Sequence, residues 1–210
     1  HTGDLACKTE DGNYRITVDT NGKRAHTLVA GIDDAQSAYT LAKGASFTTP
    51  ALALAYSNEG IGGVSRSYHR WARLNNKIHN GTALRKTLLN SWEGVYFNVN
   101  EQNMTSLMDG VKAVGAELFV MDDGWFGNKY PRNNGSTSLG DWVTDRNKLP
   151  GGVPALERAC AERGLKWGIW IEPEMTNTAS ELYEKHPDWV LKAPERDVVT
   201  GRGGTQLVLD

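Results

Sequence analysis

The sequence predicts an α/β protein in which a β-rich segment precedes a series of parallel βαβ units. Strand-like and helix-like patterns alternate from residue 87 onward, and this alternation is typical of parallel sheets covered by helices. The strand-like runs 117–121 and 165–171 are apolar on both faces, as buried parallel strands are. Residues 1–58 instead show the period-two alternation of half-buried strands.

Strands are the elements predicted for the N-terminal β region. Residues 14–18 alternate strictly between apolar and polar side chains, and residues 39–48 and 51–56 alternate less strictly. The dipeptide Asn21-Gly22, which follows the first run, predicts the tight turn of a β-hairpin.

Residues 59–86 form the next segment, which we interpret as a helical connector followed by a linker. Apolar side chains recur near helical spacing across residues 59–76, with arginines between them. Residues 75–86 are mostly polar and carry no periodicity, so a linker is expected there.

Residues 87–210 predict three βα units. The predicted strands are residues 88–92, 117–121 and 165–171. The predicted helices are residues 101–115, 153–163 and 176–185, with Gly164 and Pro187 marking the ends of the last two. A long glycine-rich loop, residues 122–150, follows the second strand. Residues 206–210 are strand-like again.

Two architectures hold such units. A closed eight-unit barrel takes about 250 residues, so residues 87–210 would be roughly half of one. An open doubly wound sheet would be nearer completion, but no Gly-x-Gly-x-x-Gly follows the first strand. The chain starts at His1 without an initiating Met and stops inside an apolar run. We therefore interpret it as an internal fragment or partial sequence of a larger protein.

Composition and charge exclude several classes of protein. Lys and Arg number 23 against 25 Asp and Glu, which leaves no basic surplus for binding nucleic acid. No apolar run is long enough to cross a membrane, so no membrane partner is expected for this segment. The two cysteines, Cys7 and Cys160, exclude a disulfide scaffold, and Cys160 is expected to be a buried free thiol in a helix.

Carboxylates and aromatic side chains follow each of the three predicted parallel strands. The three strand ends read Trp92-Glu93, Asp122-Asp123-Gly124-Trp125 and Trp170-Ile171-Glu172-Pro173-Glu174. Active sites in parallel α/β folds lie at the carboxyl ends of the strands. The repeated pairing therefore marks a candidate site.

The Asp122-Asp123 pair indicates either a ligand site or a turn. Two adjacent carboxylates in a dry pocket repel each other unless each accepts hydrogen bonds, as from sugar hydroxyls, or a metal neutralises them. Histidine is scarce nearby and no metal-ligand spacing is recognisable, so neither a metal nor another cofactor is predicted. In the alternative, the two side chains cap backbone amides of an Asp-Asp-Gly turn.

The third strand end and the segment after it hold further candidates. Glu172 and Glu174 could form an acid–base pair for glycoside hydrolysis, but Pro173 between them favours a role in organising the strand end or capping the next helix. Trp170 offers a flat wall to a ligand, or packs in the core. Arg202, among glycines, is either a planar donor to a ligand or a solvated loop residue.

Three sequons for N-glycosylation occur, at Asn80, Asn103 and Asn134. Together they favour a secreted glycoprotein, although each is a common chance match.

Seven motifs in a fixed order resemble the retaining α-galactosidases of glycoside hydrolase family 36. They are Ser65-Arg66-Ser67-Tyr68-His69, Asn90-Ser91-Trp92-Glu93, Met121-Asp122-Asp123-Gly124-Trp125-Phe126-Gly127, Leu139-Gly140-Asp141-Trp142, Lys148-Leu149-Pro150, Trp170-Ile171-Glu172-Pro173-Glu174-Met175 and His186-Pro187-Asp188-Trp189. The resemblance extends over nearly the whole chain, and the order and spacing of the motifs make it specific.

The resemblance implies a parent with an N-terminal β-sandwich, a (β/α)8 TIM barrel and a C-terminal β domain. Residues 1–58 would be the end of the sandwich and residues 59–86 the helical connector and linker. Residues 87–210 would be the first three βα units, and thus the N-terminal half, of the barrel, with residues 206–210 in a long excursion after the third strand.

The resemblance also implies roles in binding a terminal galactose. Asp122 and Asp123 would accept hydrogen bonds from its O4 and O6 hydroxyls, Trp170 would line the sugar pocket, and Arg202 would donate to galactose hydroxyls. Acceptors fixed beside the axial O4 would reject glucose, because the buried carboxylates would then lose a partner. This assignment argues against Glu172 and Glu174 as the acid–base pair.

By the same resemblance, the nucleophile is an Asp in a Lys-x-Asp motif on the fourth barrel strand and the acid–base is an Asp on the sixth. This chain holds neither motif, so no catalytic residue is expected in it. The parent would hydrolyse terminal α-galactose from melibiose, raffinose-type oligosaccharides or galactomannan branches, as a homo-oligomer. The alternatives are a transgalactosylase or raffinose-synthase-like enzyme, a non-catalytic galactose-binding fragment, and a structural βαβ domain whose carboxylates only form turns.

Overall fold

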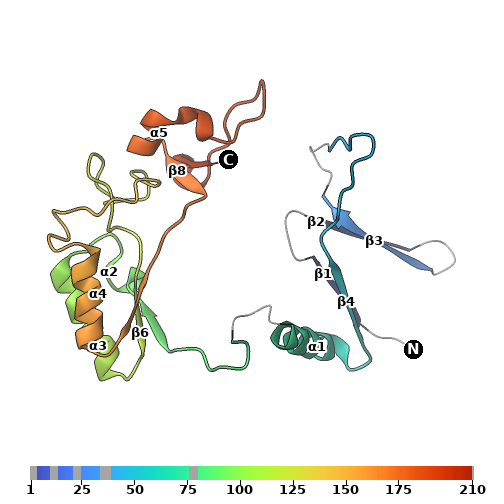
Figure 1. Ribbon diagram of the computed structural model, residues 1–210, viewed down its shortest axis with the longest axis horizontal. Coiled ribbons are helices and arrows are strands. Elements are labelled where there is room, and N and C mark those ends of the chain that lie inside the picture. Colours follow the sequence, from blue (N-terminus) through green and yellow to red (C-terminus); the bar gives the residue numbers. More distant parts are fainter. Residues whose placement is uncertain (1–3, 10–13, 21–24, 34–38, 76–79, 210) are drawn as a thin grey trace. The chain divides into compact units, whose positions relative to one another are not determined.

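The computed structural model describes residues 4–9, 14–20, 25–33, 39–75 and 80–209. Contacts divide the chain into two compact units, His1–Leu84 and Arg85–Asp210 (Figure 1). Within the described ranges, no helix has both the length and the apolar character needed to cross a membrane.

The described residues of the first unit form two antiparallel strand pairs and one helix. Its elements are β1 (Asp4–Thr9), β2 (Tyr14–Thr20), β3 (His26–Ile32), β4 (Leu52–Ser57) and α1 (Gly60–Leu74). Strand β2 pairs with β3, β1 pairs with β4, and α1 contacts both β1 and β4. The predicted helix is therefore confirmed. The predicted turn at Asn21-Gly22 lies outside the described residues.

The strand predicted for residues 39–48 is wrong, because this run contains a turn and no strand. Gly44 has a φ of +80°, and the amide of Ala45 donates to the carbonyl of Ala42 over 3.0 Å. A residue in this left-handed region reverses the chain and breaks a period-two pattern.

The second unit is built on three parallel strands in spatial order β5-β6-β7. Its core elements are β5 (Leu88–Asn90), α3 (Glu101–Ala113), β6 (Leu118–Met121), α4 (Val153–Glu162) and β7 (Lys166–Ile169). Helix α3 contacts β6, helix α4 contacts β7, and the two helices contact each other. They lie side by side along the sheet (Figure 1). The prediction of a mixed α/β fold with parallel βα units is thus confirmed.

One part of the core of this unit lies between the two helices and the sheet, and buried residues of the long loop after β6 form another part. Met104, Met108 and Val111 reach it from α3, whereas Leu156 and Cys160 reach it from α4. Cys160 is a fully buried free thiol, as predicted, and its burial raises its pKa to about 11. The side chain of Cys7 lies outside the described residues.

Two further predicted elements differ in the structure. Trp92 does not continue the first parallel strand but begins a short helix, α2 (Trp92–Val95). The helix predicted for residues 176–185 is wrong over its first half, where β8 (Met175–Asn177) pairs with β9 (Gln206–Val208). Only α5 (Glu181–Lys185) is helical.

Buried hydrogen bonds explain the strand β8. The Thr176 hydroxyl donates to the carbonyl of Leu139 over 2.9 Å, and the amide of Leu139 donates to the Asn177 side chain over 2.9 Å. The helix can then start only at Ser180, whose hydroxyl accepts from the amide of Tyr183 over 3.0 Å. These tertiary contacts override the local helical pattern.

Candidate functional site

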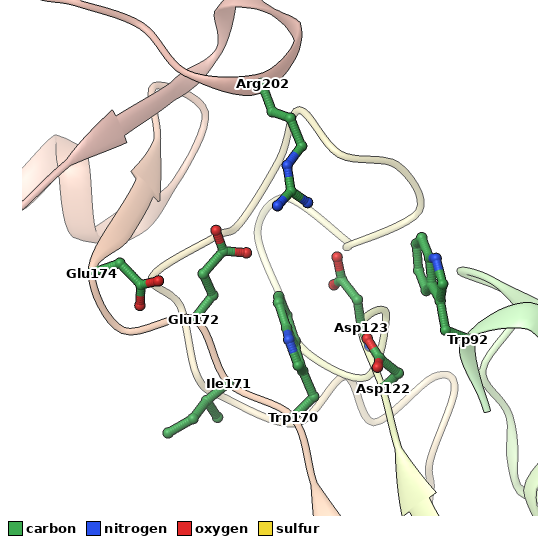
Figure 2. A pocket seen from close by; sticks show the side chains of 8 residues that line it. All are labelled: Trp92, Asp122, Asp123, Trp170, Ile171, Glu172, Glu174 and Arg202. Carbon is green, nitrogen blue, oxygen red and sulfur yellow. The ribbon is translucent and has the colours of Figure 1, made fainter. Parts of the chain in front are cut away.

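A cavity of about 360 Å³ lies at the carboxyl ends of β6 and β7. It is lined by Trp92, Asp122, Asp123, Trp170, Ile171, Glu172, Glu174 and Arg202. All four predicted binding residues, Asp122, Asp123, Trp170 and Arg202, therefore line one cavity (Figure 2). Trp92, which the sequence placed at a strand end without a binding role, lines it as well.

Asp122 follows the last residue of β6 and is held from two sides. Its backbone amide donates to the hydroxyl of Ser91 over 3.0 Å, and its carboxylate accepts from the Asn90 side chain over 2.5 Å. The other carboxylate oxygen accepts from the amide of Asp123 over 2.7 Å. The turn interpretation of the pair is thus correct for one oxygen of Asp122, while the side chain still borders the cavity.

Gly124 completes this turn and has a φ of +107°. A Cβ atom on Gly124 would lie 3.0 Å from the Cα of Phe97, so a side chain has neither the backbone angle nor the space it needs. The tight turn brings Asp122 and Asp123 to the edge of the sheet.

Asp123 is buried and forms a bidentate ion pair with Arg132. The Arg132 Nε donates to one carboxylate oxygen over 2.8 Å, and its Nη2 donates to the other over 2.7 Å. Both side chains are less than 10% exposed. The Arg132 charge therefore compensates the buried carboxylate, which answers the repulsion expected between adjacent aspartates.

The sequence did not identify Arg132. It lies in a polar stretch of the glycine-rich loop, nine residues after Asp123, and carries no periodicity that points to burial. The one available signal was chemical, since two adjacent aspartates need hydrogen-bond donors or a cation nearby, and an arginine supplies both.

The loop that carries Arg132 is anchored by two charged side chains, Lys148 and Asp141. The Lys148 ammonium donates to the backbone carbonyls of Phe97, Gly124 and Arg132 over 3.2, 2.7 and 2.9 Å. Its partial burial lowers its pKa. The Asp141 carboxylate accepts from the first backbone amides of α5, those of Glu181 and Leu182, over 2.9 Å each. The loop therefore has a defined shape.

Trp170 forms one wall of the cavity and is supported by an aromatic cluster. Its ring lies 6.0 Å from that of Trp142 and 6.4 Å from that of Phe126, measured between centroids. The indole nitrogen of Trp125 donates to the Trp170 carbonyl over 3.1 Å. Trp170 thus packs on the core, as one alternative expected, and also borders the cavity, while contact with a ligand stays a prediction. Trp92 stands on the other side of the aspartates (Figure 2).

Glu172, Glu174 and Arg202 complete the lining. Burial raises the pKa of Glu172, the nearby Arg202 opposes this rise, and Glu174 reinforces it. Figure 2 shows the Arg202 guanidinium reaching toward Glu172 and Asp123. Neither glutamate caps the next helix, because Ser180 caps α5. Across the described residues, no hydrogen bond or ion pair engages the Arg202 side chain.

The arrangement suits a ligand rich in hydroxyl groups. It combines carboxylate acceptors, a free guanidinium donor and two indole walls. Within the part of the chain that the structure describes, no group of three or more His, Cys, Asp or Glu residues is placed to hold a metal ion.

Known proteins resemble this chain in sequence and in fold. A profile of the Melibiase family matches residues 46–210. The chain is 40% identical over 208 residues to a probable alpha-galactosidase C of Aspergillus flavus and 39% identical over 202 residues to alpha-galactosidase AgaA of Geobacillus stearothermophilus. Each alignment covers 95% of this chain and 27% of the relative.

A solved structure of an AgaA variant in complex with 1-deoxygalactonojirimycin matches with a TM-score of 0.89 and 36% identity. The match covers 99% of this chain and 29% of that chain, so the chain spans between a quarter and a third of the length of these relatives. Because the family profile covers most of the sequence and the fold agrees, the chain belongs to the Melibiase family, the α-galactosidases of glycoside hydrolase family 36.

Proposed function

We propose that this chain is the galactose-recognition part of an α-galactosidase that releases terminal α-linked galactose with retention of configuration. The observation that carries the proposal is the gathering of Asp122, Asp123, Trp170 and Arg202 around one cavity. Relatives support the substrate class, because structures of AgaA variants hold stachyose and raffinose.

The two aspartates have acceptor capacity left for sugar hydroxyls. An ionised carboxylate offers about four acceptor positions. Asp122 and Asp123 each use two of them in the contacts described above. The remaining positions would accept from the O4 and O6 hydroxyls of galactose, and Arg202 would donate to its hydroxyls. The faces of Trp170 would pack against the apolar side of the ring.

The catalytic pair is proposed to lie outside this chain, on later strands of a (β/α)8 barrel. In this proposal β5, β6 and β7 are the first three strands of that barrel, and residues 87–210 are its first three βα units. Retaining hydrolysis needs a nucleophile and an acid–base about 5 Å apart across the scissile bond. No residue of this chain is assigned either role, and no cofactor is needed.

The first unit is proposed to be the end of a β-sandwich over residues 1–58, joined to the barrel by a connector over residues 59–86. Apolar side chains of its strands are half-exposed, among them Val18, Val29 and Leu54. Further strands of a sandwich would cover them. We also propose that the parent is a homo-oligomer. We propose that it is secreted, which the exposed sequons at Asn80 and Asn134 support.

Kinetics on the full-length protein test the proposed function. With an aryl α-galactoside as substrate, Asp122→Asn should lower kcat/KM by about 10- to 100-fold, because hydrogen bonds to a charged acceptor are lost. The exposed Asp188, on the short 3-10 helix η1 (Pro187–Trp189), supplies the matched control. Asp188→Asn should leave kcat/KM unchanged.

Product analysis tests the stereochemistry and the reaction class. NMR should detect α-galactose as the first product, and water should outcompete sucrose as the acceptor. Preferential transfer of galactose to sucrose would identify a transferase instead. Equal kcat/KM for Asp122→Asn and the wild type would contradict the assignment of this cavity.

A further inference from the structure

Arg132 is the largest fully buried side chain of the described residues, at 2% exposure. Besides its two hydrogen bonds to Asp123, its Nη1 donates to the Thr137 carbonyl over 2.7 Å and to the Asn177 side chain over 2.9 Å. Its guanidinium carbon lies 5.5 Å and 5.6 Å from the ring centroids of Phe97 and Phe126. The guanidinium is therefore held in one place by aromatic rings and by four hydrogen bonds.

Asn177 connects this pair to the segment that carries Arg202. The side-chain nitrogen Nδ2 of Asn177 donates to the carbonyls of Gly135 and Thr205 over 3.2 and 3.1 Å. Thr205 directly follows the short 3-10 helix η2 (Arg202–Gly204). One continuous network thus joins Asp123, Arg132, Asn177 and the loop of Arg202, from the end of β6 to the β8–β9 pair.

Arg132 is placed to act on the 360 Å³ cavity through Asp123. It is not among the residues that line this cavity, although it borders a neighbouring one of about 260 Å³. Its planar fork uses one acceptor position on each oxygen of Asp123. The planar guanidinium thereby fixes the orientation of the carboxylate and the direction in which its remaining acceptor positions point. A lysine ammonium, which is a point charge on a flexible chain, could not fix this orientation in the same way.

We propose that Arg132 is the positioning residue of the sugar site, which aims the free acceptor positions of Asp123 at one hydroxyl of the terminal galactose. This inference rests on the proposed function. It assigns to Arg132 an effect on selectivity, beyond its contribution to folding: Arg132 determines how strongly the enzyme distinguishes galactose from the analogue that lacks the hydroxyl bound by Asp123.

The test uses the full-length protein and three aryl glycosides: the α-galactoside and its 4-deoxy and 6-deoxy analogues. In Asp123→Asn, removal of one of the two hydroxyls should cost little further activity, and this identifies the hydroxyl that Asp123 binds. Arg132→Lys should reduce discrimination at that same hydroxyl by at least about tenfold and leave discrimination at the other intact.

A double-mutant cycle provides the second measurement. Arg132→Met should lower kcat/KM for the galactoside by about 30-fold or more, because a buried carboxylate loses its partner. In the Asp123→Asn background, Arg132→Met should lower kcat/KM by less than about threefold, because the carboxylate that Arg132 positions is already absent. Arg163→Met is the matched control, since Arg163 forms a similar two-point pair with the exposed Asp109, and activity should not change.

The outcomes separate this inference from the proposed function. A wild type that does not cleave the α-galactoside overturns both. Suppose instead that the wild type is active, that Arg132→Lys lowers kcat/KM by the same factor on all three glycosides, and that the effects in the double-mutant cycle are additive. The proposed function then stands, and the positioning role of Arg132 is overturned. The melting temperature of each variant is measured to establish whether it folds. If Arg132→Met does not fold, the Arg132→Lys selectivity and the Asp123→Asn/Arg132→Met double variant decide.

Discussion

Neighbouring carboxylates around the cavity differ in what balances their charge. Asp123 is paired with a buried arginine, whereas Asp122 relies on a neutral side-chain amide and a backbone amide. Burial raises the pKa of Glu172, and the charges of Arg202 and Arg132 oppose this rise only in part. The site therefore combines an acceptor held by an ion pair, Asp123, with a carboxyl group, Glu172, whose pKa is raised.

The raised pKa of Glu172 makes a prediction about stability. The folded protein holds this proton to a higher pH than the unfolded chain does, so ionisation of Glu172 destabilises the fold as the pH rises. In the Glu172→Gln variant this loss of stability does not occur, because glutamine does not ionise. The melting temperature of the variant relative to the wild type should therefore increase between about pH 4 and pH 7. A difference that stays constant over this range would contradict the assigned environment.

The residues that could be predicted were those that directly follow strands. Asp122, Asp123 and Trp170 were placed because parallel strands present their carboxyl ends at one edge. Arg202 was placed by the family resemblance. Arg132 could not be placed, because its position depends on how the loop of residues 122–150 folds. That loop is fixed by contacts with distant segments: its Asp141 accepts from the amide of Glu181, and its Lys148 donates to the carbonyl of Phe97.

At the scale of elements, periodic segments with clear ends were predictable. Helix α3 begins after Asn100, whose side chain accepts from the amide of Asn103 over 2.8 Å, and α4 ends before Gly164, which has a φ of +74°. Strand β8 was not predictable, since its conformation is set by buried bonds from Thr176 and Asn177 to Leu139. Local propensity fails where polar side chains are satisfied across the fold.

Two glycines of the second unit should respond oppositely to alanine. Gly124→Ala should destabilise the protein by about 1–3 kcal/mol, because the turn holds a positive φ and Phe97 crowds the new Cβ. Gly110→Ala, inside α3 with open space around the Cβ, should stabilise it by about 0.5–1 kcal/mol. Denaturant unfolding of both variants measures the two changes. Equal effects would contradict the described turn.

At the scale of the whole molecule, the chain consists of two compact units, each of which we propose to be part of a larger domain. In the second unit β6 lies between β5 and β7, and each of these pairs with no other strand of the described residues. The proposal that the sheet continues into a barrel accounts for these two open edges. The sequence predicted the parallel units because buried parallel strands are uniformly apolar, whereas closure of the sheet into a barrel stays a proposal.

The central claim is that the aspartates at the end of β6 bind a terminal galactose. A crystal structure of the full-length protein with bound galactose tests it most directly. The account predicts that the O4 and O6 hydroxyls lie within hydrogen-bond distance of the Asp122 and Asp123 carboxylates, with the ring against Trp170 and Arg202 donating to a hydroxyl. Galactose bound elsewhere, with Asp122 and Asp123 free of contact to it, would contradict the account.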